Sequence, residues 1–224
     1  MLLNADFSKP AVVHSTEDGW IASPASGVSR LMLDRIGDEV ARATSLVRYA
    51  ANSRFSRHEH AKGEEFLVLD GVFSDEHGDY PTGTYVRNPP GSGHAPFSED
   101  GCRILVKLRQ FDPDDLVHVV IDTKDEARWR TEEGSPVSSM DLYTYGSEVV
   151  RMVRMPAGSA FSESVGDGGL ELLVVSGNVE RDGQILNAES WLRVPANSKL
   201  DVAAKSTAIL WVKTGHLPVG ESSR

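Results

Sequence analysis

Cysteine is almost absent from this chain of 224 residues, in which Cys102 is the single example. Internal disulfides and cysteine-based zinc knuckles are therefore excluded. Long apolar runs are also missing, and no stretch approaches the roughly 18 residues that a membrane-spanning helix needs. The first ten residues, MLLNADFSKP, lack the basic start and apolar centre of a secretion signal. From these absences we expect a cytoplasmic protein that does not enter a membrane.

Basic residues are fewer than acidic ones, with 23 Lys and Arg against 33 Asp and Glu and a net charge of −10. An acidic surface repels phosphate backbones, and no cluster of Lys or Arg interrupts this pattern. We therefore expect no nucleic-acid partner. The hydrophobic share of 40% and the charged share of 25% are those of an ordinary globular protein. The length fits one large domain or two small ones.

A sustained helical period is lacking, since no segment shows a convincing 3.6-residue apolar repeat over three turns. Short apolar runs rich in β-branched and aromatic residues occur instead, separated by Gly, Pro, Asn and Asp. These runs are residues 44–49, 66–69, 85–87, 104–108, 116–121, 149–155 and 209–212. Many short strands at regular spacing predict antiparallel sandwiches or barrels.

An internal repeat divides the chain into two copies of one unit. Residues 65–71 (EFLVLDG) recur 106 positions later as residues 171–177 (ELLVVSG), and residues 104–107 (ILVK) recur as residues 210–213 (LWVK). The starts of the two copies also agree, at a slightly different offset. We predict two tandem barrels, residues 1–111 and residues 112–215, followed by a flexible tail at residues 216–224.

Four residues of the first copy have the chemistry of a metal site. His58 and His60 lie two positions apart, so on a strand both imidazoles would point to one face. Glu64 follows after a glycine-containing turn, and His94 follows the rigid bend at residues 89–93. Three imidazoles and one carboxylate suit Zn²⁺, Fe²⁺, Mn²⁺, Ni²⁺ or Cu²⁺, and ligand type alone does not rank these metals.

The spacing of these residues resembles the two motifs of the cupin family. Residues 58–71 match H-x-H-x3-E-x6-G, and residues 83–94 match G-x5-P-x-G-x2-H. The chain departs from the family pattern before the first motif, where a leading glycine is absent, and after the second, where Ser98 replaces asparagine. The resemblance implies an all-β bicupin of two antiparallel jelly-roll (double-stranded β-helix) barrels. The metal ligands that it implies are His58, His60, Glu64 and His94.

A closer resemblance, over most of residues 20–111, is to the cupin domain of ChrR-type anti-ECF-sigma factors. Residues 64–75 (EEFLVLDGVFSD), residues 83–91 (GTYVRNPPG) and His94 carry it. In that family the domain binds zinc and takes part in the response to singlet oxygen and organic peroxide. The resemblance implies zinc as the metal and a sigma factor or another regulatory protein as partner. Family members also carry an N-terminal helical zinc domain that binds the sigma factor, and its His-x3-Cys-x2-Cys signature is missing from this sequence.

The second copy differs at all four ligand positions. Glu171 is retained, but it matches Glu65 rather than Glu64, and one carboxylate cannot hold a first-row metal. We expect the second barrel to bind no metal and to pack against the first. The residues at the four positions are Ser164, Gly166, Leu170 and Leu200.

Alternative interpretations stay open for several residues. The histidines and Glu64 could instead be polar surface on hairpins, and Glu65 could replace Glu64 as ligand because strand parity is lost across the turn. Residues 75–79 (DEHGD) predict a solvated hairpin tip, and Cys102 an ordinary semi-buried thiol. Residues that could line a pocket or serve in the core or surface are Tyr85, Phe97, Lys107 and Arg109. Histidines without a partner at ligand spacing are His14, His118 and His216.

Three functions fit this pattern. The first, favoured by the closer resemblance, is a regulatory or stress-sensing metal module, in which a full ligand shell would leave little room for a substrate. The second is an enzyme, since cupins resembling this one include Fe²⁺ dioxygenases that cleave small carbonyl compounds. Its metal would face an apolar pocket that holds a small molecule. The third is a structural bicupin with an adventitious metal. Resemblance to cupins also implies a homodimer.

Overall fold

The computed structural model describes residues 1–218. Across these residues the regular structure consists of strands and two short 3-10 turns, Glu17–Gly19 and Glu126–Arg128. No helix in this part of the chain is long and apolar enough to cross a bilayer. The chain forms two compact units. Unit 1 comprises Met1–Ala5 and Thr16–Lys124, and unit 2 comprises Asp6–Ser15 and the chain from Asp125 onward.

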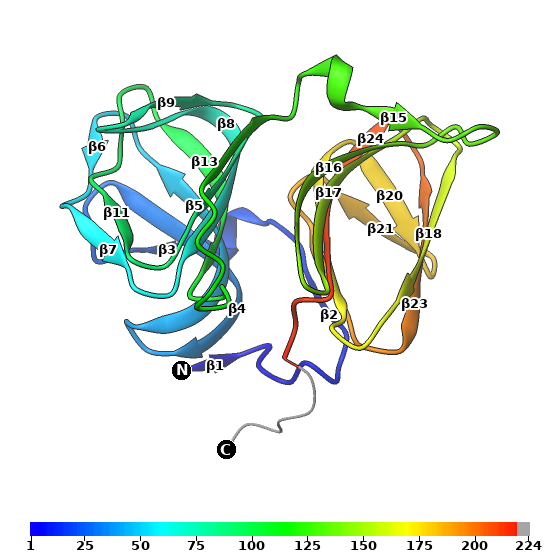
Figure 1. The fold of residues 1–224 in the computed structure, drawn as a ribbon, viewed down its shortest axis with the longest axis horizontal. Helices are drawn as coiled ribbons and strands as arrows, with labels where there is room; N and C mark the ends of the chain where they lie inside the picture. The colour runs from blue at the N-terminus through cyan, green and yellow to red at the C-terminus, as the bar shows by residue number, and fades with distance from the viewer. Residues whose placement is uncertain (219–224) are drawn as a thin grey trace. The chain divides into compact units, whose positions relative to one another are not determined.

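Unit 1 is an antiparallel barrel (Figure 1). Its longer strands are β4 (Val28–Gly37), β5 (Ala41–Tyr49), β8 (Glu64–Asp75), β10 (Thr84–Asn88), β13 (Cys102–Leu108) and β14 (Val119–Asp122). Its shorter strands are β1 (Leu2–Leu3), β3 (Ile21–Ala22), β6 (Ser53–Arg54), β7 (His58–His60), β9 (Gly78–Pro81), β11 (Ser92–His94) and β12 (Phe97–Ser98). The main sheet runs β1-β4-β5-β13-β8-β10-β14, and β7 pairs with β11 in a separate two-stranded sheet.

The core of unit 1 follows from strand alternation. On β8, Phe66 and Val68 point into the barrel, and on β13, Ile104 and Val106 meet them from the neighbouring strand. Phe73 adds a ring whose centroid lies 4.7 Å from that of Phe66. These side chains fill part of the barrel interior.

Unit 2 has the same architecture (Figure 1). Its first sheet contains β2 (Ala11–Val13), β15 (Arg130–Thr131), β16 (Ser138–Tyr145), β17 (Glu148–Met155), β19 (Leu170–Ser176), β22 (Trp191–Val194) and β24 (Ala208–Thr214). Its second sheet contains β18 (Ala160–Val165), β20 (Asn178–Arg181), β21 (Gln184–Asn187) and β23 (Ser198–Ala204). The strand orders are β15-β16-β17-β24-β19-β22-β2 and β18-β23-β20-β21. The predicted fold class, two tandem antiparallel cupin barrels, is confirmed.

Each unit contains the leading strand of the other sequence copy. β2, near the start of the first copy, pairs with β22 in unit 2. β14, at the start of the second copy, pairs with β10 in unit 1. The units therefore differ from the expected ranges 1–111 and 112–215. Repeat offsets compare residues along the chain, and they carry no information on which strand a residue pairs with.

The expected flexible tail, residues 216–224, falls mostly outside the described residues. Where the chain is described, Leu217 is buried in unit 2, and its amide donates a hydrogen bond to the Gly168 carbonyl oxygen over 2.8 Å. His216 Nε2 lies 3.4 Å from Glu171 Oε1. These two residues are therefore packed rather than loose, and residues 219–224 are not described.

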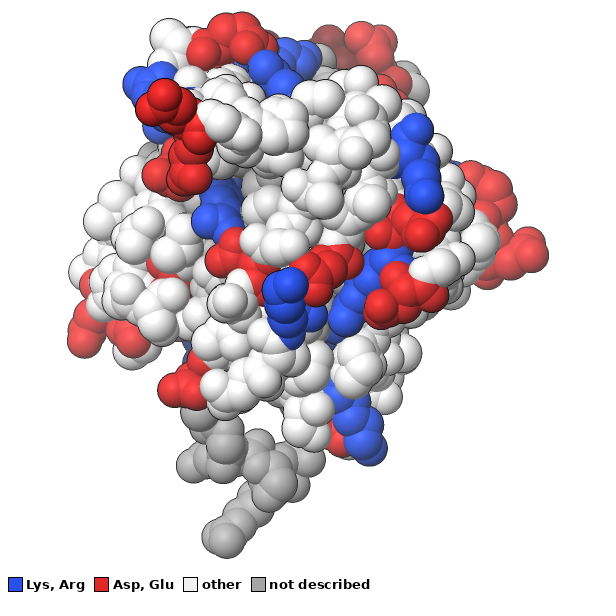
Figure 2. All heavy atoms as spheres, turned by 90° about the vertical axis from the view of Figure 1, so that its right-hand side faces the viewer, with Lys and Arg blue, Asp and Glu red and all other residues white. Residues whose placement is uncertain are grey.

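Charged side chains of both signs lie next to one another on the face drawn in Figure 2. In unit 2, the pairs Lys199–Asp201 and Lys205–Glu180 have nitrogen–oxygen distances of 2.7 Å. Exposed pairs of this kind add little to stability because water and salt screen them. The face shown thus has mixed charge rather than a segregated cationic surface.

Candidate metal centre

The pairing of β7 with β11 brings the three predicted histidine ligands together. In this antiparallel register, His58 lies opposite His94, and His60 lies opposite Ser92. A Cβ atom on Gly93 would lie 2.6 Å from the His58 carbonyl oxygen, so glycine permits this close approach. The ring centroids of His60 and His94 are 4.6 Å apart, and those of His58 and His60 are 5.1 Å apart.

Glu64 enters the same cluster from the start of β8. Gly63 takes φ +75° at the turn before β8, a conformation that favours glycine. Glu64 has the same strand parity as Phe66, so its carboxylate also faces the barrel interior. The Oε1 atom of Glu64 lies 3.6 Å from His60 Nε2 and 3.5 Å from His94 Nε2.

Glu65, the alternative ligand, lies on the other face of β8. It accepts a hydrogen bond from the Tyr85 hydroxyl over 2.8 Å, and one of its oxygens lies 3.4 Å from Arg87. Arg87 also pairs with Asp115 over 2.6 Å. Burial and then the negative charge of Glu65 hold the pKa of Tyr85 well above its usual value. The structure thus places Glu64, and not Glu65, beside the histidines.

Hydrogen bonds to Nδ1 orient all three rings. The Nδ1 atom of His58 lies 3.1 Å from the Ser56 carbonyl oxygen, and that of His60 lies 3.2 Å from Ser92 Oγ. The Nδ1 atom of His94 lies 2.9 Å from Asp75 Oδ2. Partners on Nδ1 fix ring orientation in metal sites and leave Nε2 to bind the metal.

The donor set fits one first-row metal. One ligand atom from each of the four residues can be chosen so that all lie within 4.8 Å of one another. The buried Nε2 atoms of His60 and His94 have no hydrogen-bond partner among the described residues, although buried polar atoms are normally paired. With metal–ligand bonds of about 2.0–2.2 Å, adjacent ligand atoms are about 3–3.5 Å apart. The 3.5 and 3.6 Å separations from Glu64 Oε1 are close to that range.

Asp75 belongs to this site, although the sequence predicts a solvated hairpin tip at residues 75–79. Residues 76–79 are exposed as expected, but the prediction is wrong for Asp75, which is 7% exposed. Its Oδ1 atom accepts hydrogen bonds from the His77 amide over 2.8 Å and from the Tyr80 hydroxyl over 3.3 Å. Asp75 stands outside both motifs, and the pairing of β8 with β12, in which Ser74 lies opposite Phe97, brings it near His94.

The environment sets the pKa values of the cluster. Burial disfavours the charged His94 ring, but the hydrogen bond to Asp75 and the charge of Glu64 outweigh it and raise the pKa of His94. Burial also opposes ionisation of Asp75, yet hydrogen bonds from His94 and the His77 amide hold its pKa below the usual value. Burial is the main cause that lowers the pKa of His60, and a neutral imidazole is the form that binds a metal.

A cavity of about 580 Å³ adjoins the cluster. All four cluster residues line it, together with apolar side chains that include Val28, Val47, Phe55, Phe73 and Ile104. Arg109, one of four residues whose role the sequence left open, lines it too. Tyr85 and Lys107 are buried on the opposite face of the sheet, where Lys107 donates a hydrogen bond to Thr44 over 2.8 Å. Phe97 lies instead beneath the Arg54 guanidinium.

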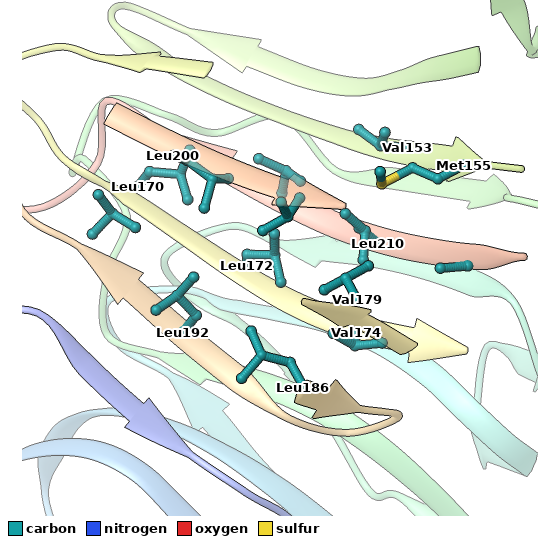
Figure 3. Close-up of a cluster of buried hydrophobic side chains, with 14 of the residues drawn as sticks. Val153, Met155, Leu170, Leu172, Val174, Val179, Leu186, Leu192, Leu200 and Leu210 are labelled. Carbon is teal, nitrogen blue, oxygen red and sulfur yellow. The ribbon is translucent and has the colours of Figure 1, made fainter. Parts of the chain in front are cut away.

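Unit 2 has aliphatic side chains at two of the positions that hold candidate metal ligands in unit 1. Leu170 and Leu200, at the positions of Glu64 and His94, are fully buried among aliphatic side chains from several strands (Figure 3). Burying each such side chain contributes about 1.5–3 kcal/mol to folding. Ser164, at the position of His58, is exposed. The interior of unit 2 is therefore a hydrophobic core without metal ligands at these positions.

Known proteins support this architecture. The family model described as ChrR Cupin-like domain matches residues 8–112 and residues 117–218. No curated protein matches the chain significantly. Among solved structures, the bacterial pirin YhhW from Escherichia coli, in complex with nickel(II), is 14% identical with a TM-score of 0.70, over 95% of this chain and 100% of that chain.

Two further structures show the same fold. A candidate dioxygenase from Nostoc punctiforme is 12% identical with a TM-score of 0.70, over 96% of this chain and 82% of that chain. Oxalate decarboxylase from Bacillus subtilis, a protein with Mn(II) centres, is 12% identical with a TM-score of 0.61, over 91% of this chain and 76% of that chain. At such identities the likeness shows the fold alone. The two family matches span nearly the whole sequence, and the chain therefore belongs to the ChrR cupin-like domain family and contains two copies of that domain.

Proposed function

We propose that unit 1 is a metal-dependent enzyme that cleaves a small carbonyl compound with O₂. In this proposal, one divalent metal is held by His58, His60, Glu64 and His94. The observation that carries it is the cavity of about 580 Å³, which these ligands and apolar side chains line together. Pockets that bury small molecules among apolar walls and a few polar groups are typical of substrate sites. A purely regulatory metal has no need of such a space.

The metal would supply Lewis-acid polarisation of a carbonyl oxygen and, as Fe²⁺, redox chemistry toward O₂. The same donor set suits zinc, which the ChrR resemblance implies, as well as nickel and manganese, which YhhW and oxalate decarboxylase contain. The identity of the bound metal therefore distinguishes the proposed enzyme from a zinc-based regulator. In the overall reaction both oxygen atoms of O₂ enter the products as one carbon–carbon bond breaks, so no further oxidant or reductant is required.

The protein side chains position and enclose the reaction. Asp75 and Ser92 hold His94 and His60 in orientation, and Asn88 donates a hydrogen bond to Glu64 Oε1 over 3.2 Å. The apolar wall keeps water from the substrate, which strengthens electrostatic interactions inside the cavity. Asp75 also holds the Nδ1 proton of His94, so that the Nε2 lone pair stays directed toward the cluster.

The test is oxygen consumption. Protein reconstituted anaerobically with Fe²⁺ is mixed with small 1,3-diketones, α-hydroxyketones and keto acids in an oxygen electrode. We expect O₂ uptake equal to substrate loss for at least one class, and no uptake with the Zn²⁺-loaded protein or with His94→Ala. If stoichiometrically loaded Fe²⁺ protein consumes no O₂ with any of these classes, the enzymatic proposal is wrong.

A regulatory module is the second candidate, and the ChrR family match favours it. In that case zinc would stabilise the arrangement of β7, β8 and β11, and loss or oxidation of the site would change binding to a sigma factor or another regulatory protein. The test is co-elution of the zinc-loaded chain with ECF sigma factors of its own organism, before and after peroxide treatment. Co-elution that peroxide abolishes supports this candidate, and its absence contradicts it.

A further inference from the structure

Two arginines of β4, Arg30 and Arg35, line the cavity in addition to the metal cluster. They are five positions apart, so on a regular strand their side chains would face opposite sides. The register of β4 with β5 shifts between Met32 and Asp34, where a bulge adds one residue. This extra residue returns Arg35 to the inner face. The bulge thus gives the cavity two guanidinium groups on one strand.

These cations have little internal compensation. Arg30 makes no hydrogen bond or ion pair with any residue the structure describes, and its Nε atom is buried. Arg35 is 5% exposed and donates a hydrogen bond to the carbonyl oxygen of Asp38. Burial, followed by the nearby charge of Arg30, lowers the pKa of Arg35. Buried cations without an anionic partner are costly, so the arrangement favours a bound anion.

The carboxylates near the arginines do not fill that role. Glu39 and Glu59 also line the cavity, and both are exposed to water. Glu39 and Asp38 lie near enough to Arg35 to raise its pKa against the effect of burial, and Asp38 is exposed and pairs with the N-terminal amine. A solvated carboxylate interacts weakly because water screens its charge. Glu64, the remaining carboxylate of the lining, belongs to the metal cluster.

Arg35 lies across the sheet from the metal cluster. In consecutive pairings Arg35 is opposite Ala43, Ala43 opposite Leu108, and Leu108 opposite Glu64. Arg35 and Glu64 are therefore three strands apart in one row, or about 14 Å along the sheet at about 4.8 Å per strand. The sheet curves around the cavity, so the distance across it is shorter. A molecule of several carbons can reach from the arginines to the histidines.

The wall between these two ends is apolar. Val47 and Ile104 are adjacent on neighbouring strands, and Val106 and Phe73 also line the cavity. We propose that Arg30 and Arg35 form a carboxylate-binding subsite, so that the ligand of this cavity is a small carboxylic acid with an apolar body. Its other end reaches the histidine cluster. The identity of the substrate rests on the proposed function. If unit 1 is the proposed enzyme, its substrate is a keto acid whose carbonyl group lies at the metal.

The test compares three eight-carbon probes that differ only in head group. Octanoate, octanol and octylammonium are titrated into the full chain by calorimetry, after EDTA treatment so that no metal contributes. We expect one octanoate per chain, bound at least about tenfold more tightly than octanol, because a carboxylate accepts charge-assisted hydrogen bonds from a guanidinium group and these are stronger than those of a neutral hydroxyl. Octylammonium should bind more weakly than octanol. Equal binding of the three probes, or no binding of octanoate, overturns the subsite.

Variants then locate the anion. Arg30→Gln and Arg35→Gln should each weaken octanoate about tenfold and leave octanol unchanged. Arg48→Gln is the matched control, since Arg48 lies on β5 but pairs with Glu17 outside the cavity. Arg35 is buried and its variant can fail to fold, in which case Arg30→Gln, half-buried on the same strand, decides the result. If Arg30→Gln is folded and binds octanoate as the parent does, the subsite is wrong.

This outcome is independent of the enzyme assay. If octanoate binds the metal-free protein but the Fe²⁺ form takes up no O₂, the carboxylate subsite is supported and the proposed reaction is wrong. If the Fe²⁺ form takes up O₂ with neutral diketones but the titrations show no head-group preference, the reaction is supported and the subsite is wrong.

Discussion

Asp75 Oδ2 lies 2.9 Å from His94 Nδ1, and this hydrogen bond joins the end of β8 to the end of β11. Asp75 contacts no other predicted ligand in this way, yet it fixes the ring whose Nε2 atom faces Glu64. The bond therefore makes Asp75 a positioning residue of the cluster.

Replacing this carboxylate should weaken metal binding without removing a ligand. Asp75→Asn keeps the shape of the side chain but loses the negative charge that holds the His94 proton. We expect metal affinity to fall about 10–100-fold, the usual cost of losing such a partner. Competition titration with a chromophoric chelator measures it. Asp70→Asn, on the exposed part of the same strand, is the control, and equal affinities for the two variants would contradict the role of Asp75.

Chelation should destabilise unit 1 selectively. The metal would link β7, β8 and β11, and the unfolded chain has no preformed site. At a free metal concentration about 1,000 times Kd, binding adds about 4 kcal/mol to the free energy of unfolding. Calorimetry of metal-loaded and EDTA-treated protein should show a lower Tm for one transition after chelation. Identical thermograms for the two forms would argue against a structural contribution of the metal.

The core of unit 2 should be sensitive to truncation without affecting the metal. Leu172 is 0% exposed within the aliphatic cluster of Figure 3. Leu172→Ala should lower the free energy of unfolding by about 2–5 kcal/mol, since a large buried side chain leaves a cavity. Ile185→Ala, at a position 40% exposed, is the control and should change it by about 0.5 kcal/mol or less. Denaturant titration measures both effects, and equal losses would contradict this core.

The thiol of Cys102 should be inert in the folded chain. Burial raises its pKa from 9.0 to about 11, although a hydrogen bond with Ser98 acts in the opposite direction. At pH 8 the thiolate fraction is therefore about 100-fold lower than for an unfolded thiol. We expect labelling by a disulfide reagent to require unfolding. Rapid labelling of native protein at pH 8 would contradict the burial.

The same shift gives a pH dependence of stability. The folded pKa lies above the unfolded one, so the contribution of the neutral buried thiol is full below about pH 9 and is lost as the pH rises through about 11. Cys102→Ser should lack this component of the alkaline loss, which urea titrations at pH 8 and pH 10 can measure.

Much of the fold follows from local sequence signals. The apolar runs at residues 66–69 and 104–108 became the central strands β8 and β13, because alternating side chains there bury one face. The 106-residue offset correctly paired EFLVLDG with ELLVVSG as equivalent strands of two barrels. The exchange of β2 and β14 between the units was not predictable, because strand pairing depends on spatial neighbours.

Only the site residues that belong to a sequence motif could be predicted. His58, His60, Glu64 and His94 have fixed spacing, and the structure brings their ligand atoms together. Asp75 and Arg35 belong to no motif. Asp75 reaches His94 through the pairing of β8 with β12, and Arg35 faces the cavity only because a bulge in β4 reverses its parity. Register and bulges depend on pairing with another strand, so neither is readable from one segment.

Metal content of the purified chain and its variants tests the central claim most directly. Elemental analysis should find one first-row metal per parent chain, and none held tightly by His58→Ala or His94→Ala. Glu171→Gln, the matched change in unit 2, should retain one metal. One tightly bound metal per chain in both histidine variants would contradict the assignment of these four residues as the metal centre.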